Sequence, residues 1–284
     1  MNKEKFVELA TQAFPEAEIT ETTVNKGYGT REGITVRING ARISPTVYPE
    51  TFPEDFGVDD IKDVIEKAYE NAPVVDPESI IPDFEDADLR MKVCPLDSPL
   101  NEANGGVGKT LLDMTAVPYL KLKVMGDSAS ITITPAILDM WDKTIDEVVE
   151  KATANTVQNA NVAGMNDVMA EMMFGAESSA VGINELNSLP NDMMYVISNE
   201  EKIQAAGAIT SPEFLSAIRE QVGNYYILPS SIHELLVVPV TDRGAEELQA
   251  MVQDVNDTQV SPEDRLTYSV YRYTEAGLEI AATA

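Results

Sequence analysis

Apolar and polar residues alternate along the chain with two different periods, and each period predicts one kind of element. Apolar residues three and four positions apart predict amphipathic helices, as in VDDIKDVIEKAYE, where Ile61, Val64 and Ile65 lie on one face. Alternation at every second position predicts strands with one buried face. We predict helices over residues 3–14, 58–70, 144–155, 165–173, 211–222 and 244–255, and strands near 17–25, 31–38, 89–93, 119–126, 128–134, 193–198, 225–230, 233–240 and 267–273.

Several short signals mark where these elements begin or turn. Thr144 and Glu147 form a capping-box pattern, in which each side chain bonds the other residue's backbone N–H. Ser211 followed by Pro212 marks a second helix start. Further local signals predict a helix N-cap at Asp59 or Asp60, a helix start in SPEDR at residues 261–265, and a two-residue hairpin turn at Asn39-Gly40 before an edge strand with Pro45.

Helices and hairpins are mixed along the chain without strict strand–helix–strand alternation. This order predicts an α+β fold with mixed antiparallel sheets, hairpins and flanking amphipathic helices, arranged in one or two lobes. The segment from Ala72 to Asp88 contains three prolines and six acidic residues, which favours a boundary there. We therefore expect an N-terminal lobe (residues 1–75), an acidic linker-like segment (76–90) and a C-terminal lobe (91–284).

The chain is strongly acidic, with 48 acidic against 20 basic side chains and a formal net charge of −28 at pH 7. A field of this sign repels nucleic acid and anionic membrane, which argues against direct binding to either. It suits a protein partner with a basic groove, and it also fits simple solubility in an organism with an acidic proteome. The single cysteine, Cys94, and the lack of an export signal or a long apolar stretch predict a cytoplasmic protein.

Residues 104–110 read NGGVGKT and resemble the KGGVGKT phosphate loop of partition-type ATPases. A nucleotide site here would use Lys109 and Thr110. However, Asn104 replaces the leading lysine, prolines and acids precede the loop, and Pro118 follows soon after it. Because a phosphate loop needs a strand before it and a helix starting at the Lys-Thr pair, we interpret the segment as a flexible glycine loop before a short helix. Nucleotide binding is kept as a weaker alternative.

The one histidine of the chain lies in ILPSSIHE, residues 227–234. If residues 231–238 form a strand, Ser231 and His233 lie on the same face and can touch, which is the minimum for an activated hydroxyl. A hydrolase using these two residues is therefore the alternative from another class of function. Glu234 would then point away, so a third orienting group has to come from elsewhere. The competing interpretation is a structural histidine that bonds a backbone carbonyl beside a turn.

Together with ARISPTVYPE at residues 41–50 and MMYVISNEEKIQAAGAI at 193–209, the ILPSSIHE stretch resembles a family of uncharacterised proteins. Members are encoded mainly by gut-dwelling anaerobic bacteria, often on mobile elements, and carry segments similar to ISPTIY, YVLTN…GA and ILPSSIHE. The resemblance spans most of the chain and implies no activity, because none is established for the family. It implies that four residues matter for fold or function: Ser230, Ser231, His233 and Glu234.

The sequence indicates no cofactor and no metal. One histidine and one cysteine cannot supply a conventional structural zinc site, and no calcium-loop pattern occurs. One cluster of acids is interpreted as a solvated surface and not as a cation site: Asp83, Glu85, Asp86 and Asp88.

These observations predict a non-enzymatic accessory or regulatory protein that acts through protein contacts. A sharper version is an acidic inhibitor whose carboxylates imitate DNA phosphates and block a basic nucleic-acid enzyme, such as a restriction or CRISPR nuclease. Such mimicry requires the acids to gather on one face.

The methionines at positions 165, 169, 172 and 173 suit a helix face that is either core or adaptable contact surface.

Overall fold

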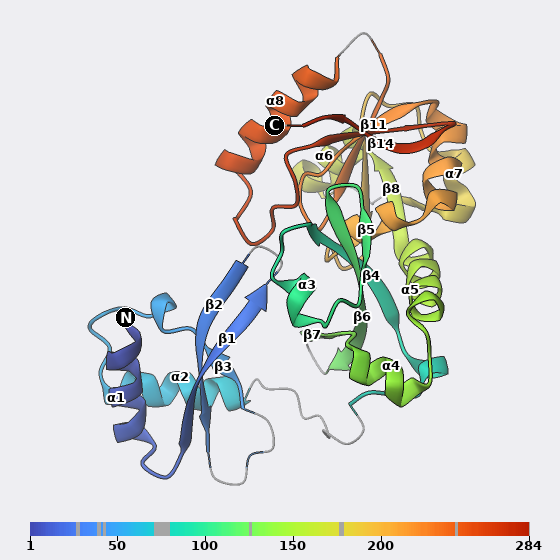
Figure 1. Cartoon of the computed structure of the whole chain (residues 1–284). Coiled ribbons are helices and arrows are strands. Elements are labelled where there is room, and N and C mark those ends of the chain that lie inside the picture. The colour runs from blue at the N-terminus through green and yellow to red at the C-terminus, as the bar shows by residue number, and fades with distance from the viewer. Residues whose placement is uncertain are drawn as a thin grey trace.

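The computed structural model describes residues 1–26, 29–38, 41, 44–70, 80–124, 127–175, 179–241 and 244–283. Within these residues the strands form three antiparallel sheets, of three, four and seven strands, with helices packed against them. Figure 1 shows the three-stranded sheet and its helices in blue, beside a larger assembly coloured green to red. The predicted α+β class is confirmed.

The N-terminal elements form a small unit with its own hydrophobic cluster. Phe6, Ile34 and Ile65 lie in this cluster and are fully or almost fully buried. The hydroxyl of Tyr69 donates to the carbonyl oxygen of Val36 at 2.7 Å, which ties the second helix to the sheet. The elements are α1 (Lys3–Ala13), β1 (Glu18–Lys26), β2 (Gly29–Arg37), β3 (Thr46–Val47), the 3-10 turn η1 (Pro49–Thr51) and α2 (Val58–Glu70).

The four-stranded sheet is built around one long strand that pairs with three others. This central strand is β6 (Met114–Val124), and its partners are β4 (Leu89–Pro95), β5 (Lys109–Leu111) and β7 (Asp127–Thr132). The helices of this region are η2 (Phe84–Asp86), α3 (Leu100–Ala103), α4 (Pro135–Trp141) and α5 (Ile145–Asn159). The apolar face of α5 buries Val148 and Ala152 against this sheet, in the main hydrophobic cluster.

The seven-stranded sheet has the order β14-β13-β11-β12-β10-β8-β9. Its strands are β8 (Ala160–Gly164), β9 (Val181–Gly182), β10 (Tyr195–Asn199), β11 (Tyr225–Leu228), β12 (Leu235–Pro239), β13 (Val270–Thr274) and β14 (Gly277–Ala282). The helices that accompany it are α6 (Met165–Phe174), η3 (Ile183–Ser188), η4 (Ala205–Thr210), α7 (Pro212–Val222) and α8 (Ala245–Thr258).

Alternation along β11 places α7 and α8 on opposite faces of this sheet. Tyr225 and Ile227 belong to the main cluster, which includes Phe214 and Ile218 of α7 and continues into the four-stranded sheet. Tyr226 instead belongs to a smaller cluster that holds the buried face of α8. Residues from both larger sheets therefore share one core.

Asp113, just before β6, also links the two larger sheets through its carboxylate. It accepts from the hydroxyl of Tyr271 at 2.7 Å and from that of Ser269 at 2.6 Å, although both lie more than a hundred and fifty residues further along the chain. Burial raises the pKa of Tyr271, so this phenol remains a neutral donor.

Most of the predicted helices are confirmed, but several local predictions are wrong. Helix α2 begins at Val58, so neither Asp59 nor Asp60 is its N-cap. Asp60 instead accepts the Gly57 N–H from inside the first turn. SPEDR forms a turn, and the short helix expected after NGGVGKT is replaced by strands. Strand β14 was not predicted. The Asn39-Gly40 turn lies outside the described residues.

The predicted capping box at the start of α5 is confirmed and gives a pH-dependent prediction. Glu147 accepts the Thr144 N–H at 2.9 Å, and this bond, with the Thr144 hydroxyl and Lys143, lowers the pKa of Glu147 to about 2. A depressed pKa stabilises the fold above the unfolded-state value near 4.5, and the contribution is lost as the pH falls through about 2. We expect Glu147→Gln to lower the urea midpoint at pH 6, with a gap that closes toward pH 2. A gap independent of pH would contradict this assignment.

Candidate functional site

The ILPSSIHE stretch forms the connection between β11 and β12. Strand β11 ends at Leu228 and β12 begins at Leu235, so residues 229–234 are a turn. The strand predicted over 233–240 is present from Leu235 to Pro239. It does not extend back to residue 231, as the contact between Ser231 and His233 required, so strand alternation does not orient these two side chains. The physical reason is local, because Pro229 has no N–H to offer a strand ladder and the serine hydroxyls bond their own backbone.

Two distant segments hold this turn through its backbone. The N–H of Ile232 donates to the carbonyl oxygen of Asp264 at 2.8 Å, and the carbonyl of Ile232 accepts the N–H of Ala206 at 3.3 Å. The turn therefore joins η4 to the loop before β13. These bonds satisfy backbone groups that no sheet partner reaches.

The two ring nitrogens of His233 bond the same two segments, at Gln204 and at Asp264. Nδ1 accepts the backbone N–H of Gln204 at 3.2 Å, and Nε2 lies 3.1 Å from Oδ1 of Asp264. Because a backbone N–H can only donate, we assign the ring proton to Nε2, which then donates to Asp264. The ring thus bonds a backbone N–H, and not the backbone carbonyl that the sequence led us to expect. With both nitrogens engaged, the arrangement is that of a structural cross-link.

Neither serine hydroxyl of the turn contacts the histidine ring. Ser231 Oγ accepts the backbone N–H of His233 at 3.0 Å, and Ser230 Oγ donates to the Glu234 carboxylate at 3.1 Å. A nucleophilic serine needs its hydroxyl within hydrogen-bond reach of the base. The contact expected between Ser231 and the His233 ring is therefore not formed. Glu234 bonds Ser230, so the group that orients the ring is Asp264.

A cleft of about 470 Å³ lies beside this turn. It is lined by residues from several elements, among them Arg31, Lys92, Cys94, His233 and Asp264. Its two basic side chains are engaged, since Arg31 pairs with Glu50 at 2.7 Å and Lys92 donates to Thr132 at 2.8 Å. Burial raises the pKa of the Cys94 thiol, which keeps it protonated and weakly nucleophilic at neutral pH. The cleft can hold a small polar molecule but presents no activated nucleophile among these residues.

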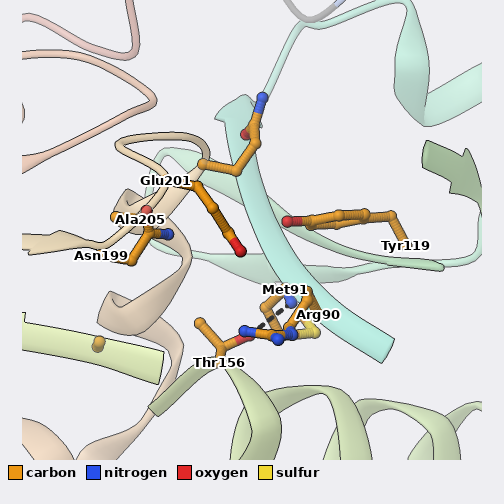
Figure 2. Close-up of a pocket in the computed structure, with 9 residues that line it drawn as sticks. Arg90, Met91, Tyr119, Thr156, Asn199, Glu201 and Ala205 are labelled. Atoms are coloured by element: carbon orange, nitrogen blue, oxygen red, sulfur yellow. Dashed lines mark hydrogen bonds between the residues drawn. The ribbon is translucent and has the colours of Figure 1, made fainter. Parts of the chain in front are cut away.

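A second, much smaller cavity lies where α5, β4 and the start of η4 meet (Figure 2). Figure 2 shows the hydroxyl of Tyr119 and the carboxyl end of Glu201 directed toward one another, with the Met91 N–H donating to Thr156 Oγ1 at 2.7 Å. Its volume of about 10 Å³ is room for about one water molecule. Burial raises the pKa of Tyr119 to about 12, so the phenol is neutral. This cavity is a packing feature and not a substrate site.

The NGGVGKT segment does not have the geometry of a phosphate loop. Lys109 and Thr110 lie in β5, where they pair with Ala116 and Thr115 of β6, and no helix begins there. Lys109 Nζ donates to Asp146 at 2.5 Å. The side chain of Asn104 is buried and accepts the N–H of Gly106 at 3.1 Å, so it uses a donor that a phosphate would need.

The acidic segment before β4 packs on the main core. Phe84 lies edge-to-face with Trp141, and Lys151 Nζ donates to the carbonyl oxygens of Phe84 and Glu85. Asp88 is half-buried and pairs with Arg90 at 2.6 Å. The remaining acids of the predicted cluster are exposed, namely Asp83, Glu85 and Asp86. Within the described part of the chain, no group of three or more His, Cys, Asp or Glu side chains is placed to hold a metal ion.

Comparison with known proteins places the chain in a family. A model of a family of unknown function (DUF5688) matches residues 3–275. The chain belongs to this family. No curated protein and no solved structure matches the chain. Since the match covers the ILPSSIHE turn, Gln204 and Asp264, every contact of His233 described above lies within the family region.

Sequence reasoning did not find the two partners of His233. Gln204 lies in the segment quoted for the family resemblance, and Asp264 lies in the SPEDR segment, which was read as a helix start. No spacing or motif connects either residue to the histidine, because the contacts join positions about thirty residues apart through tertiary structure. Among the described residues, none of the helices has the length and apolar content that crossing a bilayer requires.

Proposed function

We propose that the protein acts by binding another protein whose surface is basic, as an accessory or regulatory factor in the cytoplasm. In the sharper form of this proposal, it is an inhibitor carried by mobile elements of gut anaerobic bacteria, and it occupies the nucleic-acid groove of a nuclease. The observation that carries the proposal is the formal charge of −28 on a folded chain whose described serine and histidine side chains form no catalytic contact.

Helix α2 presents the acids as an ordered row. Asp59, Asp63, Glu66 and Glu70 are exposed and follow one another at four- and three-residue steps, which places them on one face. The row extends over roughly 16 Å at about 1.5 Å per residue. This spacing puts several carboxylates in reach of one basic groove, as phosphates along a nucleic-acid strand would be.

The position of these acids also disfavours a purely structural role. Glu70 lies at the end of α2, where the helix dipole makes negative charge unfavourable, whereas Glu66 pairs with Lys62 one turn earlier at 3.9 Å. The basic residue of the last turn is Lys67. An acid such as Glu70, which costs helix stability without filling the core, is most simply explained by an interaction outside the fold.

The hydrolase alternative receives no comparable support. A serine hydrolase requires the hydroxyl, the ring and an orienting acid in one line of hydrogen bonds. In this structure the ring and the acid, His233 and Asp264, are in contact, but the described serine hydroxyls bond elsewhere.

Neutralising the row on α2 tests this proposal. The triple variant Asp63→Asn, Glu66→Gln, Glu70→Gln removes three charges from the row. Because rim charges act through steering and complementarity, we expect partner capture at low salt to fall by about tenfold. The matched control, Asp139→Asn, Glu150→Gln, Glu220→Gln, removes three exposed charges from α4, α5 and α7 and should capture normally. Equal capture by both variants would show that the α2 row is not the binding surface.

A further inference from the structure

Helix α6 is apolar but hardly contributes to the core. Four of its ten residues are methionine, yet none of the ten is buried. Met172 and Met173 are 78% and 67% exposed, and Phe174 is 80% exposed. A helix of this length gains most of its stability from packing an apolar face. The outer face of α6 is therefore an apolar surface that the described residues leave open.

A groove of about 760 Å³ lies next to α6. Met165 and Met169 line it from the helix, and Met193 and Met194 line it from the loop before β10. Met193 is 86% exposed, so the rim is open to solvent. A second hollow of about 430 Å³, also beside α6, is lined by Val168 and Met172 together with Val196. Methionine-lined surfaces of this kind adapt their shape to an apolar partner.

The charge around this groove defines what it can accept. Between Ala152 and Glu201 the sequence contains seven acidic residues and no lysine or arginine. Asp192 lines the groove, and Glu171 lines the second hollow, where it pairs with Lys202 at 3.3 Å. A negative rim around an apolar floor complements a segment with apolar and basic faces. It disfavours anionic membrane and also a second copy of this chain, which carries the same charge of −28.

We propose that the methionine groove, formed by Met165, Met169, Met193 and Met194, binds an amphipathic helical segment of a protein partner. Apolar side chains at helical spacing occupy the groove, and lysine or arginine side chains on the flank of the segment face Asp192, the acid that lines the groove. This inference rests on the proposed function in requiring a basic protein partner, and it adds a contact on α6 that is separate from the acidic row on α2.

A model peptide tests the groove directly. The probe is an 18-residue peptide of leucine and lysine with leucines on one helical face, and the control peptide has the same composition in an order that spreads the leucines around the helix. We expect the amphipathic peptide to bind in fluorescence anisotropy at physiological salt. The variant Met169→Gln, Met193→Gln, which preserves charge and approximate shape, should bind at least about tenfold more weakly. The control variant Met140→Gln, Met251→Gln changes exposed methionines of α4 and α8 and should bind as the unaltered protein does.

Four results would overturn the inference. Equal affinity for both peptides would mean that charge alone attracts them. Unchanged binding by Met169→Gln, Met193→Gln would place the contact elsewhere. If light scattering shows that the unaltered protein self-associates and that Met169→Gln, Met193→Gln abolishes this, the groove binds a second copy of the chain. The triple α2 variant should keep its affinity for the peptide. If instead the α2 variant loses peptide binding and the groove variant keeps it, the peptide binds the acidic row on α2 and the groove is rejected.

Discussion

Replacing Gly207 by alanine is expected to be the most damaging single-methyl substitution in the described structure. A Cβ on Gly207 would lie 2.7 Å from the carbonyl carbon of Met91 and closer still to its oxygen, where real Cβ atoms are not found. Gly207 is in η4, whose residues from Ala205 to Ile209 are all buried. Met91 is fixed between β6 and the hydroxyl of Thr156. Because neither side can move away, we expect a loss of about 3 kcal/mol or more.

Urea unfolding followed by circular dichroism measures this effect. Gly182→Ala is the matched control, because a Cβ there has no atom within 4 Å. It should leave the urea midpoint nearly unchanged, whereas Gly207→Ala should shift it strongly or prevent folding. Equal midpoints for the two variants would show that η4 does not pack against β4 as described.

Replacing His233 by alanine is expected to have the second largest effect. The substitution leaves the Gln204 N–H and the Asp264 carboxylate without their bonds to the ring. Each such bond contributes on the order of 1 kcal/mol, so the loss of the two should be about 2 kcal/mol. The ring and carboxylate are about one-third exposed, at 33% and 35%, which keeps the electrostatic part of the pair small.

A double-mutant cycle separates this structural role from a catalytic one. If the ring and carboxylate stabilise each other, His233→Ala and Asp264→Ala should be non-additive in the free energy of unfolding by about 0.5 kcal/mol or more. Strict additivity of the two changes in unfolding free energy, with little loss of stability from His233→Ala alone, would contradict the structural cross-link. It would instead favour a role for His233 in the cleft beside the turn. The Ser231→Ala variant should have a smaller effect, since its hydroxyl accepts one local backbone bond.

The local sequence pattern was sufficient to predict those elements that are stabilised by contacts within a few residues. The capping box of α5 and the Ser211-Pro212 start of α7 are both present, because each depends on bonds between residues three positions apart. Helix α2 was likewise predicted from its apolar spacing, with Ile61 and Ile65 buried. The error at its N-cap arose because Asp60 bonds backward to Gly57.

Tertiary contacts decided the elements and site contacts that pattern did not predict. The glycine-rich segment continues into β5 because β6 offers an edge to pair with. This pairing cannot be predicted from the residues NGGVGKT themselves. The partners of His233 come from segments on either side of it in sequence, and alternation misled because the turn is not extended. The need for glycine at position 207 depends on β4, more than a hundred residues earlier. The open apolar face of α6 could be read from sequence as methionine-rich, but not as exposed.

The central claim is that the acidic surface takes the place of nucleic acid on a basic partner, and competition with DNA tests it most directly. Tagged protein is incubated with a lysate of the organism that encodes it, at about 50 and 200 mM salt, with and without excess duplex DNA, and the retained proteins are identified by mass spectrometry. We expect to recover a nucleic-acid-binding protein that is retained at low salt and released both by high salt and by DNA. A retained partner that is indifferent to salt and to DNA would contradict it.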